Sequence, residues 1–514
     1  MIYNSVILSA VVSAYKRLQR SYHSSMTAAV LKEFSVWTRK LFAESAILNF
    51  IKKPDFFTRA WEESAIFGVF NWLLNFPGRL CRNVYLRLEG IFLCSLAFRL
   101  LKAALSRIGA LMGLSLALML IIPDSRWHNI YSTVLIVALA FAFFLKTIIC
   151  ESESFNLKAL DFAMIVFAVS SLLAAVTSIF PVASFDYFVL YTACFLLVLL
   201  IVSSLKTGGE LETFVELLLA GVFLTALYGI WQWKVVGVPV DPSLTDVRIN
   251  KGMSGRITST MGNPNVYGEL LVLTMPFFWT AIINSRTLLK KALFAVLFVP
   301  VMVSLLLTGS RSAWISFAVS VLVFVFFKNK KLIPVMIILG ILSIPLLPQP
   351  IYDRLMTLSN PNDSSASYRK AILETAMPML RDYWVTGVGL GTDAFIAIYK
   401  RYMSFKLKTV AHTHNLYLQV WLEAGIVALI SLIWFVLRLF KKCALSIFNR
   451  TDKYINNILI AGLASLAGIL VMGLADHVWF YNRIMLIFWA DVGVILAGLS
   501  IIASKRSSLP QNME

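Results

Sequence analysis

The sequence predicts an all-helical protein, a bundle that crosses a membrane about twelve times. Of its 514 residues, 59% are hydrophobic and only 14% are charged, whereas a soluble domain is about 25% charged. Apolar runs recur along most of the chain, and many reach the ~20 residues that a helix needs to cross a bilayer. The mean hydropathy of +0.78 agrees with this assignment.

The charge and the cysteines narrow the class further. The formal net charge is +19, which in a soluble protein would suggest a nucleic-acid partner. In a membrane protein, basic cytoplasmic loops and anionic lipids account for such an excess, so we expect the lipid bilayer and no nucleic acid. None of the five cysteines falls in a predicted external segment, and their spacing fits neither a disulfide framework nor a metal site.

Residues 1–107 differ from the rest of the chain. They carry more than twice as many basic as acidic residues, and their apolar stretches, such as 64–76 and 91–101, are interrupted by basic residues and by Pro77. These stretches are too short to span a bilayer. They favour amphipathic helices on the cytoplasmic leaflet, with a plain cytoplasmic tether as the alternative.

A membrane domain is predicted at 108–503, followed by a cytoplasmic tail at 504–514. The apolar pattern predicts twelve spans in this domain. They lie at 108–122, 129–149, 161–180, 185–204, 213–233, 266–284, 291–308, 312–327, 332–347, 416–438, 455–475 and 484–503.

Basic residues alternate between the connections and set the orientation. With the basic N-terminal region inside, the connections assigned to the cytoplasm carry most of the lysines and arginines, and the short external ones carry one each: Arg126, Arg311 and Arg483. Both termini are therefore predicted to be cytoplasmic, in an inner membrane. Two longer segments, 234–265 and 348–415, fall outside, and long loops in compact proteins are usually functional.

The first external segment reads SGRITSTMGNPNVYGE at 254–269. Asn263 followed by Pro264 is a typical helix start, with a cap residue and then proline in the first turn. That structural interpretation explains the motif but leaves Arg256 unexplained.

A second arginine stands at the turn LLLTGSRSAW, residues 305–314. Gly309 permits a tight turn there, and Arg311 is placed at its external lip. The alternative is an arginine that merely extends to the membrane interface, although external arginine runs against the usual charge bias.

The large external loop, 348–415, contains a predicted amphipathic helix at 367–380 that carries Arg369. Gly387, Gly389 and Gly391 follow and formally resemble a loose dinucleotide fingerprint. No βαβ pattern surrounds them, so we interpret them as a glycine-rich turn covering a site.

Histidines close this loop at AHTHNLYLQVWLEAG, residues 411–425. His412 and His414 could suggest a metal, but no third ligand of a suitable type lies near them in the sequence. His414 followed by Asn415 could be only a helix cap, but an imidazole here could equally be a general base. The last connection, 474–483, adds Asp476, His477 and Arg483, or is an ordinary charged loop.

Several arginines and one or two histidines thus gather on the external face. Arginine binds diphosphate well because its planar fork donates two hydrogen bonds and keeps its charge. A lipid diphosphate lies at this depth. In a glycosyl transfer, arginines would stabilise the departing diphosphate, and a histidine would take the proton of an attacking hydroxyl.

Four motifs in order resemble the O-antigen ligase and polymerase superfamily of bacterial membrane glycosyltransferases. They are RITSTMGNPN (256–265), LTGSRSAW (307–314), YRKAILETAMPMLRDYWVTGVGLG (368–391) and HTHNLYLQVWLEAG (412–425). The resemblance is best over about 250–430. It implies a GT-C-like helical enzyme with an undecaprenyl-diphosphate-linked glycan donor and with neither a metal nor another cofactor.

The resemblance also implies roles for single residues. His414 is similar to the family's catalytic histidine. Arg256, Arg311 and Arg369 are similar to its diphosphate-binding arginines. Supporting positions are expected at Asn263, Asn415, His412, Asp476 and Arg483.

Ligase and polymerase remain open, and the acceptor could be a lipid, a glycan or a protein. One alternative is a transporter, since some relatives with similar motifs are described as bicarbonate transporters. Transport would predict charges near the midplane, for which Glu423 and Asp491 are the candidates. The other alternative is an assembly scaffold that depends on the N-terminal region.

Overall fold

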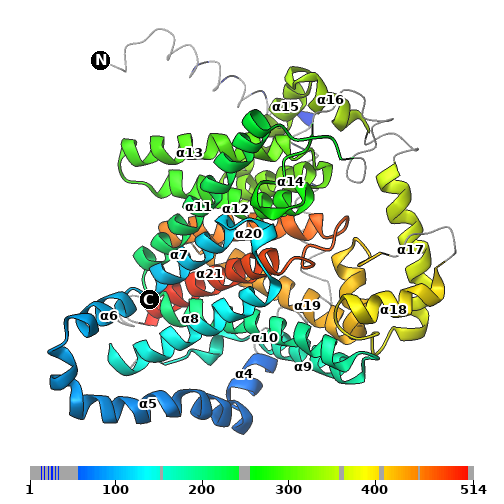
Figure 1. The fold of residues 1–514 in the computed structure, drawn as a ribbon. Coiled ribbons are helices and arrows are strands. Elements are labelled where there is room, and N and C mark those ends of the chain that lie inside the picture. Colours follow the sequence, from blue (N-terminus) through cyan, green and yellow to red (C-terminus); the bar gives the residue numbers. More distant parts are fainter. Residues whose placement is uncertain are drawn as a thin grey trace. The chain divides into compact units, whose positions relative to one another are not determined.

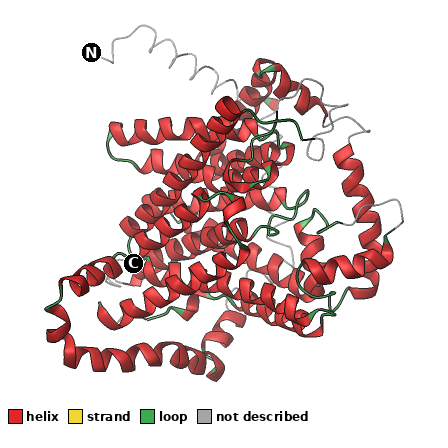
Figure 2. Cartoon of the chain, in the orientation of Figure 1, coloured by secondary structure: helices red, strands yellow, loops and turns green. Residues whose placement is uncertain are grey.

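The computed structural model describes residues 56–150, 154–241, 255–357, 364–403, 410–449 and 452–507, with a few isolated residues before position 34. Every regular element in this part of the chain is a helix, as Figure 2 shows. The chain divides into two compact units at Phe67 and Gly68. The second unit holds all the predicted membrane spans.

The helices follow one another along the chain in Figure 1. Their bounds are α4 Phe56–Glu62, α5 Ala65–Leu93, α6 Leu96–Ser106, α7 Ile108–Ile121, α8 Asn129–Ile149, α9 Phe162–Thr177, α10 Pro181–Ser204, α11 Gly208–Trp231, α12 Pro264–Asn284, α13 Leu288–Leu307, α14 Arg311–Asn329, α15 Ile333–Ser343, α16 Gln349–Met356, α17 Ser364–Tyr383, α18 Thr392–Tyr402, α19 Leu416–Phe448, α20 Lys453–Met472 and α21 Asn482–Ser507.

Each predicted span coincides with one of these helices. Eight helices are long and apolar enough to cross a membrane, and up to ten spans result if two sharply bent helix pairs are each counted as one. The prediction of an all-helical membrane protein is therefore confirmed, whereas the number twelve stays a prediction. The shortfall comes from short helices, since α9 has 16 residues and α15 has 11.

The first N-terminal apolar stretch is part of one long helix. Helix α5 runs for 29 residues with Pro77 inside it, and a second helix, α6, follows. The apolar stretch before Pro77 therefore continues through the proline into one longer helix. Neither basic residues nor one proline ends this helix, and α5 is not among the eight candidate spans.

Helices α14 and α15 form an outgoing and a returning limb. Arg311, at the start of α14, donates to the Thr357 hydroxyl at 2.8 Å. Arg354 in α16 donates to the Gly309 carbonyl at 3.3 Å. Because α14 alone is about 28 Å long, the chain must reverse after it to bring α16 back to its starting point. The reversal predicted between 312–327 and 332–347 has this geometry.

Helices α12, α20 and α21 form the most buried part of the bundle. Glycine lets neighbouring helices approach closely, as is common in membranes. A Cβ on Gly221 of α11 would lie 2.7 Å from the Cα of Ala117 in α7. One on Gly468 of α20 would lie 2.1 Å from the Ser320 hydroxyl in α14. These contacts fix the helix ends that carry the external loops.

The predicted large loop is itself folded. Helices α17 and α18 pack with the first turns of α19 around a small apolar cluster that includes Ile372, Phe395, Tyr399 and Leu422. The helix expected at 367–380 is confirmed as α17. Gly387, Gly389 and Gly391 have φ of 72°, 107° and 85°, so the glycine-rich turn is confirmed as well.

Helix α19 is broken at Gly425, where the segment after α17 joins it. Gly425 has φ of 79°, and Ile426 donates its N–H to the Trp384 carbonyl at 2.9 Å. Val388 donates in turn to the Leu422 carbonyl at 2.8 Å. These backbone bonds hold the outer helices on the mouth of α19, directly after the histidine loop.

Replacing Gly425 by alanine should therefore destabilise this junction. A Cβ would lie 1.9 Å from the Val385 carbonyl oxygen, and a positive φ alone costs a side-chain-bearing residue about 1–3 kcal/mol. We expect a lower midpoint of thermal unfolding in detergent. The matched control is Gly340→Ala in α15, where an added Cβ meets nothing within 4 Å. Equal midpoints in the two variants would contradict the prediction.

Candidate functional site

Loops from one end of the bundle bring the predicted site residues together. Arg256 precedes α12, Arg311 begins α14, Arg369 lies in α17, His414 precedes α19, and Asp476 lies between α20 and α21. Segments separated by more than 200 residues meet here because each leaves a packed helix at the same end. The site is thus carried by a rigid scaffold.

Arg256 is buried and tightly held. Its Nε donates to the Thr308 carbonyl at 2.7 Å, and its Nη2 donates to the Asn265 side chain at 2.6 Å. Burial lowers the pKa of its guanidinium to about 9. The positive charges of Arg354, Arg311 and Arg369 act in the same direction. The four guanidinium groups therefore lie within electrostatic range of one another.

The Asn263–Pro264 motif has the structural role considered for it. The Asn263 side chain accepts the N–H of Asn265 at 2.8 Å, and Pro264 occupies the first turn of α12. The same cap presents Asn265 to Arg256. The helix start and the arginine are therefore parts of one arrangement.

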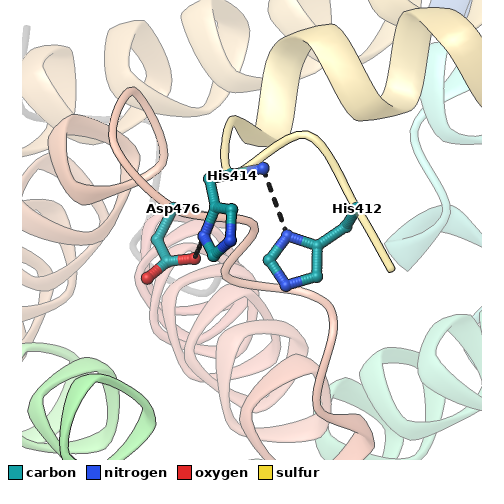
Figure 3. A group of neighbouring side chains, drawn as sticks. All are labelled: His412, His414 and Asp476. Carbon is teal, nitrogen blue, oxygen red and sulfur yellow. Dashed lines mark hydrogen bonds and ion pairs between the residues drawn. The ribbon is translucent and has the colours of Figure 1, made fainter. Parts of the chain in front are cut away.

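Arg369 and His414 meet on Asp476, as Figure 3 shows for the histidine. The Nδ1 atom of His414 lies 3.1 Å from Asp476 Oδ1, and Arg369 Nη2 lies 4.0 Å from Oδ2. Burial alone would raise the pKa of Asp476. The hydrogen bond and the charges of the histidines and Arg369 instead lower it well below its ordinary value. A charged Asp476 therefore orients His414.

This contact decides which imidazole nitrogen of His414 can react. If Nδ1–H donates to the Asp476 carboxylate, Nε2 carries the lone pair and can accept a proton. His414 itself has φ of 50°, a backbone conformation uncommon for a residue with a Cβ. Its N–H donates to Nδ1 of His412 at 3.1 Å (Figure 3). His412 thus supports the turn that presents His414.

Comparison with known proteins finds a family match over part of the chain. Residues 293–433 match the family model described as "O-Antigen ligase". The chain is thus similar to O-antigen ligases over this range. The matched range holds Arg311, Arg369 and His414, whereas Arg256 and Asp476 lie outside it.

One relative is the O-antigen ligase of Salmonella typhimurium strain LT2. It is 28% identical over 192 residues, which cover 35% of this chain and 48% of the relative. The chain thus spans about half the length of the curated relative it matches. The match to the O-antigen ligase family model and the candidate membrane spans together indicate a multi-pass membrane protein.

Two predicted supporting residues make structural contacts between loops. The Asn415 side chain caps α19 by accepting the Leu418 N–H at 2.9 Å, and it donates to the Leu474 carbonyl at 3.0 Å. Arg483 donates to Asp124 at 2.6 Å and to the Ile122 carbonyl at 2.7 Å. Both residues join neighbouring external loops.

Sequence reasoning missed Arg354, Asn265 and Gln419. Arg354 is buried beside Gly309, although it stands in an unremarkable amphipathic helix. The Gln419 side chain accepts the Thr413 N–H at 2.8 Å and donates to Glu423 at 2.8 Å. A signal did exist for Gln419 and Glu423, since two polar residues one turn apart in an apolar span need partners.

Asp476 adds a third potential metal ligand beside His412 and His414, which the sequence did not predict. Ligand atoms of His412, His414 and Asp476 lie within 4.8 Å of one another, so a third ligand type is present after all. Spacing could not reveal it, because Asp476 follows His414 by 62 residues. The position beside Arg369 disfavours a cation, and Nδ1 of His412 already accepts a backbone N–H.

Glu423 and Asp491, the two carboxylates that a transporter could use, form hydrogen bonds with neutral side chains. Glu423 accepts from Gln419, and Asp491 pairs with the Ser465 hydroxyl. Among the described residues, the single cluster with metal-ligand geometry is the one at His414, in the external loops.

His412 should make the stability of the fold depend on pH. Burial, assisted by the charge of His414, lowers its pKa from 6.5 to about 4. Below pH 6.5 the unfolded chain takes up this proton before the folded one, so the free energy of unfolding falls until about pH 4, by about 2–3 kcal/mol. We expect the midpoint of thermal unfolding to drop over this range.

The matched variants are His412→Phe and His128→Phe, because His128 is exposed. His412→Phe should reduce the drop between pH 6.5 and 4.5, and His128→Phe should leave it intact. An undiminished drop in His412→Phe would show that other groups control it.

Proposed function

We propose that this chain transfers a glycan from an undecaprenyl-diphosphate-linked donor to an acceptor hydroxyl on the external face of the membrane. The observation that supports this most directly is the placement of the His414–Asp476 pair beside a cluster of four arginines. A base next to a diphosphate-sized cationic site is what a glycosyl transfer from a lipid diphosphate requires. The similarity to O-antigen ligases over residues 293–433 supports the same reaction class.

In the proposed step, Nε2 of His414 takes the proton from the acceptor hydroxyl as its oxygen attacks the anomeric carbon of the donor. The new glycosidic bond forms while the bond from that carbon to the diphosphate breaks. Asp476 stabilises the imidazolium that results, in the manner of a carboxylate that orients a general base. The proton is afterwards released to solvent.

The arginines act on the leaving group. Negative charge grows on the diphosphate as the bond breaks, and fixed donors aimed at growing charge are usually the largest electrostatic term in catalysis. Arg256, Arg311, Arg354 and Arg369 approach from four different segments, so they can surround both phosphates. No step in this scheme requires a metal.

The test uses the purified full chain in detergent, a radiolabelled polyprenyl-diphosphate glycan, and lipid, glycan or protein acceptors. We expect free polyprenyl diphosphate to form together with labelled product, and chelation by EDTA to leave the rate unchanged. One added glycan would indicate a ligase, and a ladder of products a polymerase. Product formation that stops with EDTA and returns with a divalent ion would refute metal independence. A donor left intact with every acceptor, by a protein that unfolds cooperatively, would refute the transfer itself.

A further inference from the structure

A cavity lies at the end of α8 opposite the arginine cluster. It measures about 260 Å³ and is enclosed by α5, the last turns of α8 and the residues that follow α8. Its polar lining comes from Asn71, Asn75, Arg79 and Arg82. Because α8 has 21 residues, its two ends are about 30 Å apart. The cavity is therefore distinct from the proposed active site.

One face of helix α5 lines this cavity. Asn71, Asn75, Gly78 and Arg82 recur at spacings of three and four, so they form a single stripe along the helix, and all of them line the cavity. The helix approaches α8 closely at Gly78, where a Cβ would lie 2.8 Å from the Thr147 hydroxyl. The polar stripe is thus docked on a membrane span.

The far side of α5 is apolar and uncovered. Large side chains there are exposed, among them Val69, Trp72, Phe76, Leu80 and Val84. A helix with one basic, polar stripe and one exposed apolar face lies at a membrane interface, with the apolar face among acyl chains. A molecule that occupies the cavity while touching this face must itself have a polar head and an apolar tail.

The charge of the cavity specifies that head. Arg82 donates one N–H to the Ile148 carbonyl at 3.2 Å and keeps further donors. Arg79 makes no hydrogen bond or ion pair with the described residues. The two guanidinium groups and the Asn71 amide form a donor set suited to phosphate oxygens. Asn75 instead braces the cavity wall, because its side chain exchanges hydrogen bonds with the Phe155 backbone at 2.8 and 3.3 Å.

This end of the bundle is also the basic one. Lys102 is held against the end of α8, since its carbonyl accepts from the Cys150 thiol, and Lys146 and Lys158 lie in α8 and just after it. The predicted orientation places these residues on the cytoplasmic side, where anionic lipids attract basic segments.

We propose that the cavity between α5 and α8 binds the phosphate headgroup of an anionic phospholipid of the cytoplasmic leaflet. Asn71, Arg79 and Arg82 hold the headgroup, and the acyl chains lie along the apolar face of α5. The N-terminal amphipathic helix is thereby fastened to the bundle by a lipid. This inference does not depend on the proposed glycosyl transfer.

The test measures lipid binding to the full-length protein in detergent by native mass spectrometry, with phosphatidylglycerol as the probe. Phosphatidylcholine and inorganic phosphate are the comparison ligands. The variants are Arg79→Gln and Arg82→Gln. Arg87→Gln is the matched control, because Arg87 lies on α5 but does not line the cavity. Loss of a hydrogen bond to a charged group should weaken binding about tenfold or more.

We expect phosphatidylglycerol to bind more tightly than phosphatidylcholine, and both cavity variants to lose that preference while Arg87→Gln keeps it. Arg79 is exposed, so its variant should fold even if Arg82→Gln does not. Equal binding by all three variants would overturn the proposal. So would a site that takes inorganic phosphate but shows no preference for the anionic lipid.

Discussion

Replacing His414 by alanine is expected to lower the rate of glycosyl transfer by about 10²–10⁴-fold, the usual cost of losing a positioned general base. The imidazole is oriented by Asp476 at 3.1 Å and by a backbone turn that His412 supports. The variant should still bind the donor, since the arginines remain. The fall should therefore appear in kcat, measured by release of polyprenyl diphosphate, with little change in KM.

His128→Ala is the matched control, because His128 is exposed and precedes α8 in another loop. It should keep the full rate. Asp476→Asn should give a smaller loss than His414→Ala, since it disturbs the orientation of the base without removing it. If His414→Ala retained the wild-type rate while remaining folded, His414 would not be the base, and His412 or His477 would have to be examined.

Replacing Arg311 by alanine is expected to lower the rate by about 10²–10³-fold, as loss of one donor to a developing anion typically does. Arg311 begins α14 and reaches across to Thr357, so its guanidinium lies where the returning limb meets the cluster. Lysine at this position keeps the charge but not the planar fork. Arg311→Lys should therefore recover only part of the lost rate in the same assay.

Arg126→Ala provides the comparison for this series. Arg126 is an exposed arginine in another external connection, so the change in charge is the same. A similar loss in Arg126→Ala would mean that general electrostatic attraction, rather than binding of one diphosphate, explains the effect. A full rate with Arg311→Ala would remove Arg311 from the proposed site.

The helices could be predicted from the sequence because their signals are local. Apolar runs in lipid must form helices, since no water is present to satisfy the backbone. Helix α8 begins and ends where the apolar run predicts, and α12 begins at its Asn263 cap. The length of α5 was not predicted, because the apolar pattern is interrupted at Pro77 although the helix continues through it.

The candidate site could be predicted in part. Arg256, Arg311, Arg369 and His414 each stand in a motif that remains recognisable in the sequence. Arg354 has no such motif, and it enters the cluster only because α14 and α15 reverse the chain. The cavity between α5 and α8 was likewise not predicted, since it depends on where α5 docks against α8.

By itself, the sequence determined that this protein is an all-helical membrane protein, because span length and capping act over fewer than about 30 residues. Only the tertiary structure decided which polar groups act together. His414 and Asp476 are 62 residues apart, and Arg256 and Arg369 are farther apart still. Their contacts depend on how the buried helices pack, and packing complementarity is a property of the whole bundle rather than of any segment.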